Sequence, residues 1–111
     1  MTDDCTQLTL PGFEKKPSKW LAVEVIGTAA NLVGGDRADK HGDKTKNHQN
    51  IARLWSAYLQ VPITAEQVAL MMVLLKVART QHGGLNHDDY VDMAGYAGCA
   101  AEIVGKFNGL V

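Results

Sequence analysis

Five polar side chains at helical spacing are the residues of this 111-residue chain best suited to chemistry. Lys76 and Arg79 lie three residues apart in an otherwise apolar segment, so they share a helix face and their charged groups start near the core. Asp88, Asp92 and Tyr96 follow at intervals of four, which places them along one stripe of the next helix. Two carboxylates at this spacing can hold a Mg²⁺ ion, and Lys and Arg can receive phosphate oxygens. The pattern predicts a phosphate-binding surface, with Asp88 and Asp92 as metal ligands.

The same side chains also have a purely structural interpretation. Lys76 and Arg79 can extend to solvent near the end of their helix, where the helix dipole favours cations. Asp88 can cap the start of its own helix, and Asp92 can form a salt bridge to Lys76 or Arg79. Asp89 lies one step off the stripe, and we expect it in solvent. In this interpretation the charged stripe only joins two helices.

Other catalytic or metal-binding patterns are absent from the sequence. It has no glycine-rich phosphate loop of the Gly-Lys-Ser/Thr type. Two cysteines without a Cys-x-x-Cys partner indicate one free surface thiol and one small buried residue in a reducing compartment, namely Cys5 and Cys99. The four histidines match no metal-binding spacing and are expected at the surface: His41, His48, His82 and His87.

Charge and hydropathy exclude several classes of partner. With 11 basic and 12 acidic residues the net charge is -1, which gives no overall field for DNA, RNA or a membrane surface. The longest apolar run, residues 68–75, is far shorter than the roughly 18–20 residues that span a bilayer. The N-terminus has no signal-peptide pattern. We therefore expect a soluble cytoplasmic protein.

Hydrophobic periodicity predicts four helices and no strand, and thus an all-α four-helix bundle. Residues 1–17 are polar and aperiodic and are expected as a flexible tail, with one helical domain over residues 18–111. The first helix follows Ser18 and stops at Gly34-Gly35. The charged run 36–46 is expected as a loop, either solvated or in contact with a ligand.

The other three helices have clear boundary signals. The second is expected from Asn47 or His48 to Leu59, before Pro62, and the third from Ala65 to about Gln81, with Thr64 and Gln67 as a capping box. The fourth is expected from His87 or Asp88 to about Phe107, with many small residues that allow a neighbour close. Because residues 68–75 are apolar on every side, we expect that helix to be buried all round. A domain of this size rarely encloses one helix, which favours a homo-oligomer.

Three blocks of the sequence resemble a known group of proteins. The first contains Arg37, Asn47 and Ile51-Ala52-x-Leu54-Trp55-Ser56-Ala57-Tyr58-Leu59, and the second contains Leu74-Leu75-Lys76-x-Ala78-Arg79. The third is Asp88-x-Tyr90-Val91-Asp92-x-Ala94-Gly95-Tyr96-Ala97. Over residues 20–103 the chain resembles a small phage and prophage family of uncharacterised function, related to the MazG-like all-α nucleotide pyrophosphohydrolases.

The resemblance implies an oligomeric helical fold with a nucleotide pocket, and it adds Arg37 and Asn47 to the predicted ligand-binding residues. MazG-like enzymes bind Mg²⁺ through a Glu-Glu-x-x-Glu motif and a Glu-x-x-Asp motif on successive helices. The second motif is echoed by Asp88 or Asp89 with Asp92. The first is missing, since Lys76 and Arg79 lie where its glutamates are expected. Because two-metal hydrolysis needs several carboxylates, this departure favours binding over hydrolysis.

Three functions follow as hypotheses. The first is a protein that binds a nucleotide or nucleotide-derived signal through Lys76, Arg79 and Tyr96, and that in a phage could sequester a second messenger of host defence. The alternative is a Mg²⁺-dependent nucleoside triphosphate pyrophosphohydrolase of MazG-like type. A second alternative is a helical interaction module with no ligand.

Overall fold

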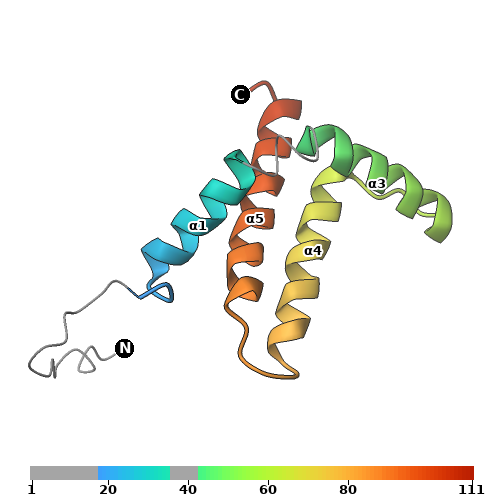
Figure 1. Cartoon of the computed structure of the whole chain (residues 1–111). Helices are drawn as coiled ribbons and strands as arrows, with labels where there is room; N and C mark the ends of the chain where they lie inside the picture. The colour runs from blue at the N-terminus through green and yellow to red at the C-terminus, as the bar shows by residue number, and fades with distance from the viewer. Residues whose placement is uncertain (1–17, 36–42) are drawn as a thin grey trace, which may run out of the picture.

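Four helices and no strand form the part of the chain that the computed structural model describes, residues 18–35 and 43–111. They are α1 (Ala22–Gly34), α3 (Lys44–Leu59), α4 (Ala65–Thr80) and α5 (His87–Phe107). Figure 1 shows α5 between α1 and α4, with α3 crossing the N-terminal end of α4 and then diverging from it. The predicted all-α class is confirmed. The predicted tail and most of the charged loop, including Arg37, lie outside the described residues.

The boundaries of α4 follow from its capping residues, as predicted. The Thr64 hydroxyl accepts a hydrogen bond from the Gln67 amide at 3.1 Å, and the Gln67 side-chain oxygen accepts one from the Thr64 amide at 2.9 Å. This reciprocal pair satisfies two amides that the helix itself leaves free. After Thr80 the chain turns through Gly83, whose φ of 85° lies in the left-handed region that glycine adopts without strain. α4 and α5 therefore form an antiparallel hairpin.

Helix α3 begins earlier than predicted, at Lys44 rather than at Asn47 or His48. The cause is Asp43, whose Oδ1 accepts hydrogen bonds from the amides of Thr45 at 2.8 Å and Lys46 at 3.3 Å. The hydrogen bond from the Thr45 amide, and after it the one from the Lys46 amide, lowers the pKa of the Asp43 carboxyl below its ordinary value. The end of the charged run is thus the first turn of a helix, and Lys44 has a fixed place on it.

Small side chains let α1 and α4 both reach α5. Ala69, Cys99 and Ala100 form a buried cluster, and Val33 of α1 packs against it. A Cβ atom on Gly95 would lie 3.4 Å from a methyl carbon of Val33, which is van der Waals contact, so α1 and α5 lie close together at this glycine. The predicted close approach along the fourth helix is confirmed, and so is the burial of Cys99, which raises the pKa of its thiol.

The expectation that the third predicted helix is buried all round is wrong for a single copy of the described chain. Val68 and Ala69 are completely buried, but Leu74 is 65% exposed. The outer face of α4 is a continuous apolar surface made by Leu70, Met71, Leu74 and Leu75. No helix among the described residues has the length and apolar character needed to cross a bilayer.

Removing the capping box will test this account of α4. Thr64→Ala should lower the free energy of unfolding by about 1 kcal/mol, because one amide loses its acceptor at the helix start. Denaturant unfolding measures the change. Thr28→Ala is the matched control, since the Thr28 hydroxyl only donates back to a carbonyl inside α1. Equal stability of the two variants would contradict the capping role.

Candidate ligand-binding site

A cavity of about 550 Å³ lies between α1, the start of α3 and the inner face of α5. Its apolar wall comes from α1 and α5 and consists of Ala29, Leu32, Val33, Val91, Gly95 and Cys99. Its polar lining comes from α3 and α5 and consists of Asp43, Lys44, Asn47, His48, Asp92, Tyr96 and Lys106. A concave apolar pocket of this size with a few convergent polar groups is typical of small-molecule sites. The early start of α3 brings four of the polar side chains to it.

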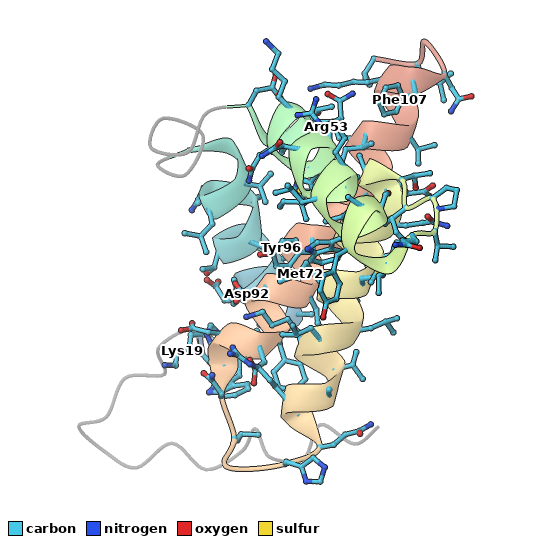
Figure 2. All side chains as sticks on the ribbon, turned by 90° about the vertical axis from the view of Figure 1, so that its right-hand side faces the viewer. Lys19, Arg53, Met72, Asp92, Tyr96 and Phe107 are labelled. Atoms are coloured by element: carbon cyan, nitrogen blue, oxygen red, sulfur yellow. The ribbon has the colours of Figure 1, made fainter. Side chains whose placement is uncertain are left out.

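The floor of the cavity carries an ion pair between α4 and α5. Lys76 Nζ lies 3.0 Å from Asp92 Oδ2, and the two side chains are only 12% and 18% exposed. Figure 2 labels Asp92 and Tyr96, which lie one turn apart in the N-terminal half of α5. Because Lys76 holds one carboxylate oxygen, the other oxygen can accept a hydrogen bond from a ligand. The salt bridge of the structural interpretation is thus present, and one of its members also lines the cavity.

Two rings meet on the same side of the cavity. His48 and Tyr96 lie edge to face, with their ring centroids 6.3 Å apart and their planes at 70°. His48 is buried, and its Nδ1 donates to the carbonyl of Lys44 at 2.7 Å, which leaves Nε2 as the acceptor of the neutral ring. The prediction of a surface position is therefore wrong for His48. The pair offers aromatic surface, an acceptor nitrogen and a phenolic hydroxyl.

Two lysines meet at the end of the cavity where α3 begins and α5 ends. Lys44 Nζ and Lys106 Nζ each lie 3.2 Å from the same oxygen, Oε2 of Glu102. Lys106 also donates to the Thr45 hydroxyl at 3.0 Å. Partial burial acts to raise the pKa of Glu102, but the hydrogen bonds and positive charges of Lys44 and Lys106 outweigh it, and the pKa lies below its ordinary value. Glu102 is therefore ionised at neutral pH, between two ammonium groups.

Several predicted site residues lie elsewhere. Arg79 is on the hairpin side of α4–α5, in a separate open hollow of about 590 Å³. Its Nη1 is 4.0 Å from Oδ1 of Asp89. Asp89 is buried, so the expectation that it is solvated is wrong, and its Oδ1 has no hydrogen-bond partner among the described residues. Asp88 faces solvent with a side chain 83% exposed, and Asn86 rather than Asp88 caps α5.

The predicted magnesium ligands are not brought together as a metal site in the described residues. Asp92 lines the cavity, whereas Asp88 does not. Within residues 18–35 and 43–111 no group of three or more His, Cys, Asp or Glu side chains is close enough to hold a metal ion. Asp36, Asp39 and His41 of the charged run lie outside the described residues. The described lining of the cavity thus contains two carboxylates, of Asp43 and Asp92, and two lysines, Lys44 and Lys106.

Of the predicted ligand-binding residues, Asn47 and Tyr96 line the cavity, and Lys76 reaches it only through Asp92. Sequence reasoning missed Lys44, His48 and Lys106 as lining residues. Asp43 followed by polar residues was the available signal, because an N-cap aspartate there places Lys44 and His48 on one helix face. No local pattern joins Lys106 to them, since it is 62 residues away from Lys44 in the sequence.

Comparison with known proteins shows the family. Residues 24–104 match the family model described as Domain of unknown function (DUF6378), and the chain belongs to this family. It is 47% identical to the Gene 55 protein of Mycobacterium phage L5 over 77 residues. This aligned segment is 68% of this chain and 49% of that protein. It is 37% identical over 83 residues to the Gene 55 protein of Mycobacterium phage D29, covering 75% of this chain and 55% of that protein.

The chain therefore spans about half the length of these curated relatives. No solved structure matches it. The predicted membership of a small phage family of uncharacterised function is confirmed, and the family is DUF6378. The relation to MazG-like enzymes stays a prediction, since neither the family description nor the names of these relatives mention it.

The ion pair between Lys76 and Asp92 should contribute to the stability of the fold. Lys76→Ala should lower the free energy of unfolding by about 1–3 kcal/mol, because it leaves the largely buried Asp92 carboxylate without its partner. Lys46→Ala, an exposed lysine on α3, is the control and should change stability little. The double variant with Asp92→Asn should recover part of the loss. Full additivity of the two single changes would contradict the coupling.

Proposed function

We propose that this member of the DUF6378 family binds a nucleotide or a nucleotide-derived small molecule in the cavity between α1, α3 and α5. The observation that carries the proposal is the combination of an apolar wall, two rings, a held carboxylate and two lysine side chains around one space of about 550 Å³. A nucleotide presents matching parts: a base, a sugar with hydroxyl groups, and phosphate. Each part has a chemically suitable partner in the lining.

We assign each part of the nucleotide to the lining residues that suit it chemically. The base fits beside His48 and Tyr96, where flat aromatic surface is available. Sugar hydroxyls or an amino group can donate to the free oxygen of Asp92, whose other oxygen Lys76 holds. Phosphate fits the lysine end, at Lys44 and Lys106. These two lysines are better placed than Lys76 and Arg79 to donate hydrogen bonds to phosphate. Lys76 is already paired with Asp92, and Arg79 faces another hollow.

Binding without hydrolysis is better supported than the pyrophosphohydrolase alternative. Two-metal hydrolysis needs several carboxylates around the ions, and the described lining supplies only Asp43 and Asp92. Asp43 is already committed to the first amides of α3. Mg²⁺ would therefore need ligands from outside the described residues. In a protein with phage relatives, capture without turnover would serve to sequester a nucleotide signal of host defence.

We also propose that the chain works as a homo-oligomer. Among the described residues only Ile103 and Val68 are large side chains that are fully buried, whereas the outer face of α4 exposes Leu70, Met71 and Leu74. A small core next to a continuous apolar face is expected where a second copy completes the burial. The resemblance stated above implies the same assembly.

Nucleotide binding can be measured by calorimetry with EDTA present, using a panel of nucleoside phosphates. Asp92→Asn should weaken binding about tenfold or more, because a hydrogen bond to a charged acceptor contributes about 1.5–3 kcal/mol. Asp88→Asn is the matched control on the same helix, since its side chain is 83% exposed, and it should bind as the wild type does.

The outcomes of this titration separate the three hypotheses. Binding in EDTA that depends on Asp92 supports capture. Pyrophosphate release from a triphosphate on addition of Mg²⁺ would favour the hydrolase instead. If the folded chain binds none of the nucleotides, the proposed function is contradicted. The helical interaction module with no ligand then remains as the hypothesis.

Oligomerisation has its own test in sedimentation velocity or light scattering across a range of concentrations. The wild type should sediment as an oligomer, and Leu74→Glu should dissociate it, because the charge enters the apolar face of α4. Thr28→Glu, at an exposed position of α1, should leave the assembly intact. A monomeric wild type at high concentration would overturn the proposed assembly.

A further inference from the structure

The two lysines at the end of the cavity form a group with a definite charge. Lys44 and Lys106 come from α3 and α5, 62 residues apart, and contact the same oxygen of Glu102 at 3.2 Å. Both lysines line the cavity, with side chains 28% and 39% exposed. We call these three residues the lysine cluster. Its formal charge is one positive unit, since one carboxylate stands between two ammonium groups.

The cluster retains hydrogen-bond donors for a ligand. An ammonium group carries three N–H donors. Lys106 directs two of them to Glu102 and to the hydroxyl of Thr45, and Lys44 directs one to Glu102. The remaining three are enough for the two or three non-bridging oxygens of a single phosphate group. They are too few for the oxygens of a polyphosphate chain.

The rest of the described lining adds no net positive charge, and Asp43 places a negative charge near Lys106. Lys76 offsets Asp92, and the amides at the start of α3 stabilise the negative charge of Asp43. A nucleoside triphosphate brings about four negative charges, which normally arrive with Mg²⁺ held by protein carboxylates. The described lining offers neither the positive charge for the free triphosphate nor the acid cluster for its metal complex.

We propose that the lysine cluster is the phosphate subsite and that it selects nucleotides carrying one phosphate group, without a metal ion. Glu102 sets this selectivity, because it cancels one of the two lysine charges and occupies one donor of each lysine. The inference rests on the proposed function and specifies its ligand class. Single phosphate groups occur as monoesters, with three non-bridging oxygens, and as cyclic diesters, with two, and the three remaining donors of Lys44 and Lys106 are enough for either.

Calorimetry in EDTA on the full chain tests the subsite with three forms of each common nucleoside: the 5′-monophosphate, the 3′,5′-cyclic monophosphate and the 5′-triphosphate. The wild type should bind a monophosphate or cyclic form at least about tenfold more tightly than the triphosphate of the same nucleoside. Comparing the affinity for the 5′-monophosphate with that for the cyclic monophosphate decides between a monoester and a diester ligand. A triphosphate bound as tightly as either form would overturn the selectivity.

Substitutions in the cluster give the sharper comparison. Glu102→Gln keeps the size of the side chain and removes its charge, so it should improve triphosphate binding about tenfold and bring it closer to that of the monophosphate. Lys44→Gln and Lys106→Gln should each weaken monophosphate binding by about tenfold or more. Lys46→Gln, exposed on the same turn of α3 as Lys44, should have no effect. Circular dichroism confirms that each variant is folded, and having two lysine variants covers the loss of either one to misfolding.

The result also separates this inference from the function on which it depends. Binding that is lost in Asp92→Asn but unchanged in the Glu102 and lysine variants would overturn the subsite and keep nucleotide binding in the cavity. A wild type that binds none of the nucleotides would overturn both. An unchanged preference for the monophosphate in Glu102→Gln would show that Glu102 does not set the selectivity.

Discussion

The ion pair between Lys76 and Asp92 is the constraint on which the arrangement of the site depends. Both side chains are largely buried, and a charge removed from water is tolerated only where an opposite charge and hydrogen bonds meet it. The pair therefore fixes the register of α4 against α5. It also fixes which oxygen of Asp92 remains free and where Tyr96, one turn further along α5, enters the cavity (Figure 2). Shifting either helix by a turn would separate the charges and remove the floor of the cavity.

The cavity also depends on small residues where the helices pack against one another. Ala69, Cys99 and Ala100 form a buried cluster between α4 and α5, and Gly95 lets Val33 of α1 approach. The helices lie close where these residues meet, and the cavity opens beside them, toward the start of α3. A chain with a core this small depends on each of these contacts. The same thin core leaves the outer face of α4 for a second copy in the proposed assembly.

Local sequence signals predicted the helices well and the site only in part. The capping box of Thr64 and Gln67 and the four-residue spacing of Asp92 and Tyr96 are local features, and both were interpreted correctly as structure. The pairing of Lys76 with Asp92 was among the predicted alternatives, because opposite charges on neighbouring apolar helices need each other. The prediction for Asp89 was wrong, since its position off the stripe indicated solvent, whereas its side chain is buried near the turn between α4 and α5.

The lysine cluster was beyond sequence reasoning for a physical reason. Lys44 lay in a charged run that is normally solvated, and only the capping hydrogen bonds of Asp43 turn it into a helix start. Lys106 reaches it through the tertiary fold and through Glu102, which joins them over a long sequence separation. Contacts of this kind leave no periodic pattern. They are also the contacts on which the proposed phosphate subsite rests.

The central claim is that a nucleotide binds between α1, α3 and α5 and not at the hairpin end of the molecule. Amide chemical-shift mapping of the ¹⁵N-labelled chain during titration with a nucleoside 5′-monophosphate in EDTA tests it most directly. The account predicts that the saturable shifts gather at the first turns of α3 and around Asp92 and Tyr96. Shifts confined to the hollow of Arg79 and Asp89, or none at saturating nucleotide, would contradict it.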